Sequence, residues 1–256
     1  MEVELMTNLD DFWPPSATVA PRRRDSARSG HARRQKALTR DEIVQAAVVL
    51  ADTEGAAAVN MRRIAKELDV GVMSLYWHVA DKEQLLDLML VAIEGEDVPA
   101  SESLDWRTDL ARIARQKRQS LLRHPWVVIF ISERSPFGPN ALLQIERSLA
   151  VLDRCNLDTA TTLQILMTFD NYVTGSVLNE LREIRIERTQ TEAGVTQLDI
   201  TAGMQEWKDR LDRSGMFTRV LQVFDEGIDP DAAETRDDRF EFGLNCLLNG
   251  IAPLMS

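Results

Sequence analysis

The stretch Val59–Leu90 reads VNMRRIAKELDVGVMSLYWHVADKEQLLDLML, and the break Asp69-Val70-Gly71 separates two short helical patterns within it. After the break, Val72–His78 sets polar and aromatic side chains beside aliphatic ones. A helix needs this arrangement when one face packs inward and the other face reads a groove. Two short helices joined by a tight turn are typical of the helix-turn-helix, whose second helix enters the major groove of DNA. DNA binding is therefore the leading hypothesis.

Capping residues predict where the helices around this stretch begin and end. Thr39 and Glu42 form a capping box for a first helix, and Gly55 follows that helix as a stop. Asn60 can cap a second helix. The run Asp81–Gln84 supplies the cap of a longer helix that follows the third one. Three helices and a connecting fourth make a complete small domain.

The chain of 256 residues is predicted to be all-α, because helical periodicity continues beyond this domain and no credible β hairpin occurs. We expect three regions, namely a tail over residues 1–37, a helix-turn-helix domain over residues 38–98 and a larger helical domain over residues 99–256. In the larger domain the predicted helices are Asp105–Arg123, Asn140–Arg154, Thr159–Arg188, Ala202–Arg213, Phe217–Glu226 and Arg236–Met255.

The net charge of −11 is unusual for a DNA-binding protein, but the charges are unevenly spread. Most of the acidic residues lie in the C-terminal two thirds, which need not approach phosphate. Residues 22–40 instead hold eight Lys or Arg and one Asp. Residues 1–37 contain several prolines and no periodicity, which predicts a disordered, Arg-rich tail. Either a solvated arm or a basic arm that touches DNA fits this composition.

Other classes of protein fit the sequence less well. No run of eighteen apolar residues occurs, so we expect no membrane span. Cys155 and Cys246 lie far apart in helical patterns, which predicts buried thiols in a reducing bacterial cytoplasm. The sequence lacks a nucleophile motif, a cluster of metal ligands and a Gly-rich phosphate loop. We therefore expect neither an enzyme nor a bound cofactor or metal.

The segment Leu75-Tyr76-Trp77-His78-Val79, followed by Asp81-Lys82 and Leu85-Leu86, resembles the DNA-binding domain of the TetR family of transcriptional regulators. The likeness covers Thr39–Leu90, and the run Phe240–Leu248 also resembles the last helix of the family's regulatory domain. The resemblance implies that the third helix, with neighbouring cations, faces the major groove. The implied DNA-binding residues are Arg62, Val72, Met73, Ser74, Tyr76, His78 and Lys82.

Side-chain chemistry supports these implied roles. Tyr76 and His78 can donate hydrogen bonds to phosphate oxygens, and Lys82 can anchor a phosphate. Arg62 can reach a base edge or a phosphate. Val72 stands where the tetracycline repressor has a polar side chain that reads a base, so direct hydrogen-bonded readout is reduced. The operator sequence therefore does not follow from this helix.

The same helix also needs residues that hold it in place. We expect Leu75 and Trp77 to pack inward. In the alternative reading, Tyr76 and His78 merely complete a small core, although so short a helix would leave their polar atoms poorly satisfied.

The resemblance also implies how the larger domain works. Family members dimerise through a four-helix bundle, for which we expect the apolar residues Val173, Val177, Leu181, Leu244, Leu247, Leu248 and Ile251. A pocket between the other helices is implied for an apolar or aromatic effector. The expected lining residues are Trp126, Phe130, Gln164, Met167, Phe169, Asn171, Tyr172 and Trp207. We expect no metal–drug complex in this pocket, because His124 is the only histidine of this domain.

These features together predict a dimeric, ligand-responsive regulator that binds a palindromic operator and is released by a small hydrophobic ligand. Repression is the expected outcome of DNA binding. A transcriptional activator of the same fold and a helical adaptor that does not bind DNA are the alternatives.

Overall fold

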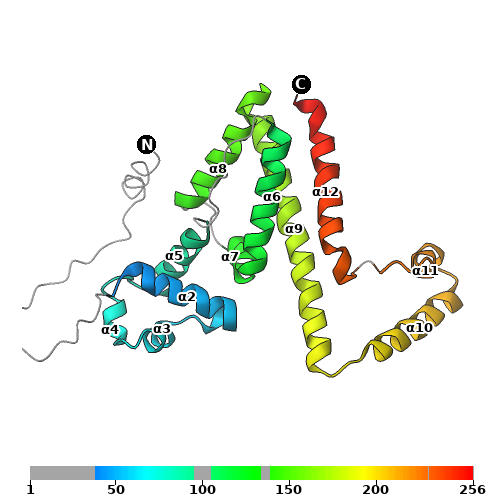
Figure 1. Cartoon of the computed structure of the whole chain (residues 1–256), viewed down its shortest axis with the longest axis horizontal. Helices are drawn as coiled ribbons and strands as arrows, with labels where there is room; N and C mark the ends of the chain where they lie inside the picture. Colours follow the sequence, from blue (N-terminus) through cyan, green and yellow to red (C-terminus); the bar gives the residue numbers. More distant parts are fainter. Residues whose placement is uncertain (1–37, 95–104, 134–138, 230, 256) are drawn as a thin grey trace, which may run out of the picture. The chain divides into compact units, whose positions relative to one another are not determined.

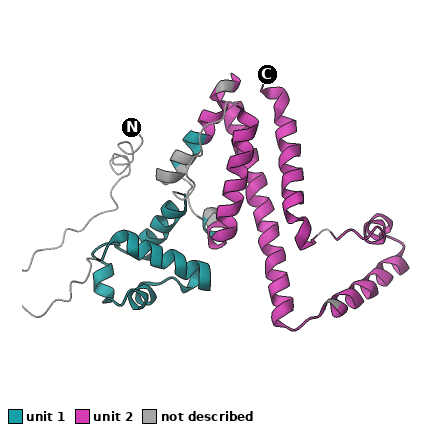
Figure 2. Ribbon diagram, viewed as in Figure 1, with its two compact units in different colours: residues 1–98, 129–147 teal, residues 99–128, 148–256 magenta. Residues whose placement is uncertain are grey.

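The computed structural model describes residues 38–94, 105–133, 139–229 and 231–255 (Figure 1). Every regular element within these ranges is a helix, which confirms the predicted all-α class. The predicted tail over residues 1–37 lies outside the described residues. The chain divides into two compact units (Figure 2). Residues 1–98 and 129–147 form the first unit, and residues 99–128 and 148–256 form the second.

The first unit contains the helices α2 (Arg40–Glu54), α3 (Met61–Glu67), α4 (Val72–Leu75) and α5 (Lys82–Glu94), with a 3-10 turn over Ala56–Ala58. These helices surround an apolar core. The side chains of the core with no exposed surface include Ile43, Ala47, Val59, Ile64, Leu75, Leu85 and Met89. Each of these four helices contributes at least one of them, so the core joins the four helices.

Local capping contacts fix the helix starts in this unit. The Thr39 hydroxyl accepts a hydrogen bond from the Glu42 amide at 3.2 Å, and the Glu42 carboxylate accepts one from the Thr39 amide at 3.0 Å. The predicted capping box is therefore confirmed. Asn60 Oδ1 accepts from the Arg63 amide at 3.0 Å, and Asp81 Oδ1 accepts from the Gln84 amide at 2.8 Å. The predicted caps of α3 and α5 are also present.

The third helix is shorter than predicted. Regular α4 ends at Leu75, whereas the sequence predicts a helix as far as His78. Residues 76–78 form a turn, in which the amides of His78 and Val79 both donate to the Leu75 carbonyl at 2.9 Å. The turn brings Val79 into the core, where it is 1% exposed. The chain then reaches the cap of α5 within two residues.

The second unit is built on three helices, α6 (Trp106–Arg123), α9 (Thr159–Glu192) and α12 (Arg236–Ile251), which lie side by side in Figure 1. Their shared core includes Leu110 from α6, Phe169 and Val173 from α9, and Leu244 and Leu248 from α12. This core positions the two helices for which the sequence predicts a dimer interface.

Several helices differ from their predicted ranges. Helix α7 (Trp126–Glu133) lies outside the predicted helices and begins directly after His124-Pro125. Proline is tolerated at the start of a helix, so a new helix begins directly after it. Helix α8 (Pro139–Leu152) lies near its expected position. Helix α10 (Gln197–Ser214) begins five residues before the predicted Ala202, because Thr196 and Asp199 form a capping box.

Helices α9 and α12 approach closely around Gly243. The Tyr172 hydroxyl donates to the Phe240 carbonyl at 2.5 Å, and the two rings lie 5.7 Å apart between centroids. A Cβ atom on Gly243 would lie 2.5 Å from the Tyr172 hydroxyl oxygen. Only glycine therefore fits at this crossing without a shift of the neighbouring ring.

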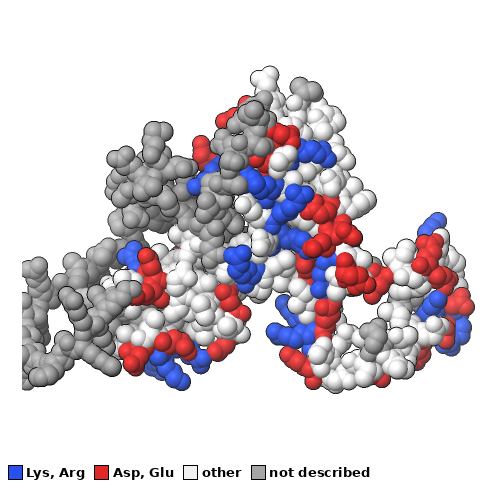
Figure 3. Space-filling model, in the orientation of Figure 1, with Lys and Arg blue, Asp and Glu red and all other residues white. Residues whose placement is uncertain are grey.

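A row of ion pairs, here called the ionic seam, joins the same three helices. Arg118 of α6 binds Glu180 of α9 through two hydrogen bonds, at 2.9 and 3.1 Å, and Asp237 of α12 at 2.7 Å. Arg115 of α6 binds Glu241 of α12 at 2.6 and 2.7 Å. Figure 3 shows Lys and Arg alternating with Asp and Glu over this part of the surface. The cations of the seam are thus neutralised within the protomer.

The ionic seam continues at a buried carboxylate on α9. Glu183 is 6% exposed and accepts hydrogen bonds from Arg236 at 3.1 Å and from Arg239 at 2.7 Å. Burial alone would raise the pKa of Glu183, but the two guanidinium groups outweigh it and hold the pKa below the ordinary value. Hydrogen bonding from Arg115 likewise lowers the pKa of Glu241. Glu183 is therefore a charged partner of α12, and Glu241 is a charged partner of α6.

Helix α10 and helix α11 (Thr218–Asp225) form a hairpin with little shelter from solvent. Trp207 and Phe224 meet edge to face with centroids 5.3 Å apart, and Lys208 pairs with Asp225. Many apolar side chains of the hairpin and its ends are exposed, namely Val195, Leu198, Met204, Met216, Phe217, Val220, Val223 and Ile228. Among the described helices, none is long and apolar enough to cross a membrane.

Candidate DNA-binding site

The segment Val72–His78, here called the recognition element, is held by a few buried residues. Leu75 is fully buried, and Val79 follows the element as a second anchor. The Ser74 amide donates to the Gly71 carbonyl at 2.8 Å and closes the first turn. These contacts fix one side of the element in the core and leave the other side in solvent.

The outward side of the recognition element is apolar and aromatic. Met73 is 73% exposed and Tyr76 is 46% exposed. Tyr76 therefore does not complete the core, as the alternative reading required. Val72, Ser74 and His78 are half-buried. Large apolar side chains exposed on so short a segment are unusual unless they meet a partner.

The prediction that Trp77 packs inward was wrong. Trp77 is 73% exposed, whereas Leu75 is fully buried. Residues two positions apart on a helical turn point to nearly opposite sides, so burial of Leu75 directs Trp77 outward. The spacing between the two residues could have shown this from the sequence. The exposed side thus contains Trp77 in addition to Met73 and Tyr76.

Two of the predicted cations flank the recognition element in sequence and remain exposed. Arg62 lies on α3, and Lys82 is the first residue of α5. The neighbouring Arg63 is different, because it pairs with Glu54 at 2.5 Å and with Glu67 at 3.1 Å. The first unit therefore offers exposed cations beside the element while Arg63 is already neutralised.

The turn before the recognition element has a constrained backbone. Asp69 adopts a φ of 52°, in the left-handed region that favours glycine. The Val70 amide donates to the Ala65 carbonyl at 2.9 Å, which closes the end of α3. The turn directs the chain into Gly71, the N-cap of α4.

One contact of the recognition element joins residues that are far apart in the sequence. Arg40, the first residue of α2, donates from Nε to the carbonyl oxygen of His78 at 3.2 Å. The two residues are 38 positions apart, and no local pattern reveals such a pairing. The start of α2 is thereby tied to the end of the recognition element.

A short recognition element with an exposed aromatic side, joined by a tight turn to a helical core, is typical of a DNA-binding transcriptional regulator of the helix-turn-helix class. Comparison with known families gives the same result for both parts of the chain. Residues 43–89 match the family "Bacterial regulatory proteins, tetR family", and residues 98–255 match "Tetracyclin repressor-like, C-terminal domain". The chain belongs to the TetR family of transcriptional regulators.

Individual relatives agree with this assignment. The chain is 31% identical over 221 residues to the HTH-type transcriptional repressor DrrR1 of Streptomyces coeruleorubidus, covering 86% of this chain and 79% of that one. It is 40% identical over 158 residues to an HTH-type transcriptional regulator of Saccharopolyspora erythraea, covering 61% of this chain and 65% of the relative. The solved structure of apo ActR from Streptomyces coelicolor is 26% identical, with a TM-score of 0.64 over 86% of this chain and 98% of that chain.

The residues predicted to line an effector pocket have different surroundings in the described residues, and their role in binding an effector stays a prediction. Phe169 belongs to the core and is 5% exposed. Tyr172 packs on Phe240, and Trp207 packs on Phe224. These aromatic side chains therefore pack against other residues of the second unit.

The other predicted lining residues are also dispersed. Trp126 is buried, with its ring 6.4 Å from that of His124. Met167 is exposed, as are the polar residues Gln164 and Asn171 of the same helix. Phe130 is half-buried and lies in a segment of the first unit.

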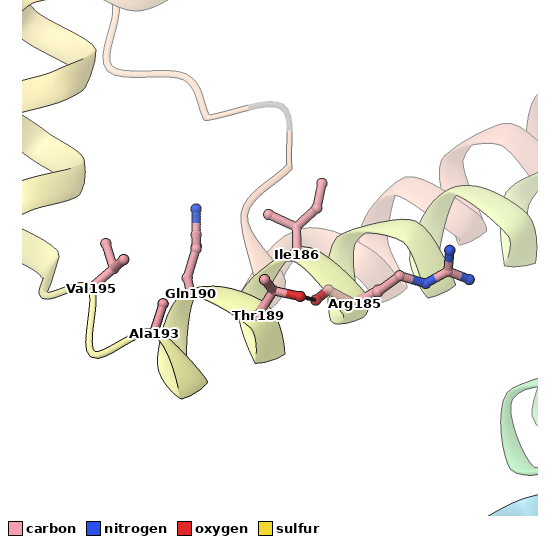
Figure 4. A pocket seen from close by; sticks show the side chains of 6 residues that line it. All are labelled: Arg185, Ile186, Thr189, Gln190, Ala193 and Val195. Atoms are coloured by element: carbon pink, nitrogen blue, oxygen red, sulfur yellow. Dashed lines mark hydrogen bonds between the residues drawn. The ribbon is translucent and has the colours of Figure 1, made fainter. Parts of the chain in front are cut away.

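A groove of about 300 Å³ lies at the C-terminal end of α9 (Figure 4). Its walls are mostly apolar, and Ile186, Gln190 and Val195 project into it from the same side of the chain in Figure 4. Arg185, Thr189 and Ala193 complete the lining. None of the predicted effector residues borders this groove.

Most of the residues predicted for the dimer interface lie inside the protomer. The side chains of Val173, Val177, Leu244, Leu248 and Ile251 are buried, and Leu181 and Leu247 are half-buried. Val173, Leu244, Leu248 and Ile251 belong to the core that α9 and α12 share with α6 in the same protomer. For these residues the interface prediction is corrected to core packing.

The opposite faces of α9 and α12 carry exposed apolar residues instead. Phe242 of α12 is 74% exposed, and Leu163, Met167 and Leu178 of α9 are also exposed. Cys246, one turn after Phe242, is exposed, so its predicted burial was wrong. Cys155 is buried as predicted, and burial raises the pKa of its thiol.

Proposed function

We propose that the chain is a dimeric repressor that binds a palindromic operator through its recognition element and is released by a small apolar or aromatic effector. The observation that carries the proposal is the exposure of Met73, Tyr76 and Trp77 above the buried Leu75. Exposure of three large side chains to water on so short a segment is unfavourable. Binding in a DNA groove would cover them, because bases and sugars provide apolar contacts beside the phosphates.

Within this proposal, phosphate contacts supply most of the affinity. Tyr76, His78, Arg62 and Lys82 offer the donors, and Trp77 adds apolar contact with the DNA backbone or groove. Val72 and Met73 can contact a thymine methyl but donate no side-chain hydrogen bond. We therefore propose docking that relies on phosphate anchors with limited direct readout of bases.

Dimerisation is proposed to use the outward faces of α9 and α12. Phe242, Met167 and Leu178 replace the buried residues that the sequence suggested. One helix-turn-helix reads few base pairs, and two of them spaced by one helical turn of DNA, roughly 34–36 Å, read a palindrome. A four-helix bundle formed from α9 and α12 of each protomer would bury these exposed side chains.

An aromatic effector is proposed from the composition of the second unit together with the relatives. ActR, which is 27% and 28% identical in the two complexes, has been solved with actinorhodin and with (S)-DNPA. The described residues of this chain bring together no group of three or more metal-ligand side chains. We propose direct binding of an organic effector without a metal ion.

A mobility-shift titration tests DNA binding in the full-length protein. Duplex DNA selected by the protein from a random pool should bind with an affinity that falls steeply as salt concentration rises. Replacing Tyr76 and Lys82 together by alanine should abolish binding and leave the dimer intact in light scattering. Salt-insensitive binding would contradict the proposal, and simultaneous loss of the dimer would show that these residues belong to the core.

A reporter assay separates repression from activation. Transcription from a promoter that contains the selected duplex should fall when the protein is present and recover when an effector is added. Increased transcription on binding would instead identify an activator of the same fold. Absence of DNA binding in the titration would favour the helical adaptor.

A further inference from the structure

Arg40 occupies an unfavourable position for a cation. It is the first residue of α2, directly after the N-cap Thr39, and the first turn of this helix also contains Asp41 and Glu42. The N-terminal end of a helix carries positive partial charge, which favours acidic side chains and disfavours basic ones. The stability of α2 therefore does not explain an arginine here, and a role outside the helix is needed.

The recognition element provides such a role. Its regular helix has only four residues, and the turn that follows leaves carbonyl groups outside the helical hydrogen-bond pattern. Arg40 Nε donates to one of them, the His78 carbonyl, at 3.2 Å. Leu75 and Val79 hold the element from the core, and Arg40 holds its end from the exposed side.

The contact with His78 uses only part of the Arg40 side chain. A guanidinium group has five N–H donors in a planar fork, and the Nε–H is one of them. The four Nη–H donors form no hydrogen bond or ion pair with the described residues, and the side chain is exposed. Because His78 is an expected phosphate contact, these donors lie beside the DNA backbone when the element is docked. The planar fork matches two phosphate oxygens at once.

Arg63 provides an internal comparison. It belongs to the same unit, carries the same charge and is also partly exposed. Its guanidinium binds Glu54 and Glu67, so its charge is satisfied within the protein. Arg40 instead binds a neutral carbonyl and keeps its full positive charge available.

We propose that Arg40 is a phosphate-binding residue of the DNA interface and also a positioning residue for the recognition element. Its Nε–H fixes the His78 carbonyl, and its Nη–H groups bind a phosphate of the DNA that the element contacts. This inference rests on the proposed DNA-binding function. It adds a cation from α2 to an interface otherwise built from α3, the recognition element and α5.

The test measures operator affinity against salt concentration for three full-length variants, Arg40→Gln, Arg40→Lys and Arg63→Gln. The probe is the duplex that the wild-type protein selects from a random pool. Because both protomers of the bound dimer lose a phosphate contact, the slope of log K against log salt should become shallower by about 1.8 in Arg40→Gln. Affinity of the dimer should fall about a hundredfold in the same variant, about tenfold for the hydrogen bond to a charged group lost in each protomer.

The other two variants separate the two roles. Arg40→Lys keeps the charge and should restore the wild-type slope, while the loss of the Nε contact leaves its affinity below that of the wild type. Arg63→Gln removes the same charge from the same unit and should leave the slope unchanged. An unchanged slope in Arg40→Gln, or an equal change in Arg63→Gln, would overturn the inference. Salt-insensitive wild-type binding would overturn the proposed function as well.

Discussion

In the first unit the helices meet through buried aliphatic side chains such as Ile43, Leu75 and Met89, whereas in the second unit the apolar core lies beside the ionic seam. The cations are used differently in the two regions. Arg115 and Arg118 are neutralised by acidic partners within the protomer, while Arg62 and Lys82 are exposed beside the recognition element. This difference explains how a chain with a net charge of −11 can bind DNA.

The largest effect is expected where a fully buried apolar anchor of the recognition element is removed. Leu75→Ala removes a fully buried side chain and should lower the free energy of unfolding by about 2–5 kcal/mol. Trp77→Ala is the matched control on the opposite side of the same element. It should leave stability within about 0.5 kcal/mol while weakening DNA binding. Denaturant unfolding and mobility shift measure the two quantities, and a large loss of stability in Trp77→Ala would contradict the outward placement.

A somewhat smaller loss of stability is expected when the ionic seam is broken at its buried carboxylate. Glu183→Gln removes the charge that accepts from Arg236 and Arg239, and it should lower the free energy of unfolding by about 1.5–3 kcal/mol. Chemical denaturation at neutral pH measures this change. Glu192→Gln, at the exposed end of α9, is the control and should have little effect.

The same carboxylate predicts a dependence of stability on pH. The pKa of Glu183 is lower in the folded protein than its ordinary value of 4.5. Its contribution to stability is therefore complete above pH 4.5 and is lost as the pH falls through the folded-state pKa. Unfolding measured from pH 6 downward should show a flatter acid limb in Glu183→Gln. An identical limb in both proteins would show that the seam does not stabilise the fold.

Disturbing the close packing between α9 and α12 should lower the free energy of unfolding by a similar or smaller amount. Gly243→Ala places a methyl group against the Tyr172 hydroxyl and should cost about 1–3 kcal/mol in the free energy of unfolding. Gly250→Ala, on the same helix, meets no atom within 4 Å and should be neutral or slightly stabilising. Thermal unfolding of the two variants distinguishes a steric effect at Gly243 from a general effect of replacing glycine by alanine.

The smallest expected effect is a gain of stability in the first unit. Asp69→Gly relieves the left-handed backbone at the turn before the recognition element, and it should stabilise the fold by about 1 kcal/mol. A rise in melting temperature with unchanged operator affinity is the expected result. A lower melting temperature would show that the Asp69 side chain stabilises the fold by more than its left-handed backbone destabilises it.

The sequence was most informative where structure depends on neighbouring residues. The capping box at Thr39 and the cap at Asn60 are local, and both were predicted correctly. The burial of a particular helix face depends on distant helices, so Cys246 and Val173 were assigned to the wrong environments. The contact between Arg40 and His78 was missed for the same reason, because it arises only after α2 and the recognition element have packed.

The exposed hairpin of α10 and α11 has a consequence for how stability can be defined. Leu198 and Met216 are 82% and 75% exposed, and most of their apolar neighbours in the hairpin are uncovered as well. Together with Phe242 they leave a protomer with much apolar surface in water, which association with a second copy can remove. For such a chain the unfolding equilibrium includes a dissociation step, so the melting temperature rises with protein concentration. A stability value then has meaning only alongside the concentration at which it was measured.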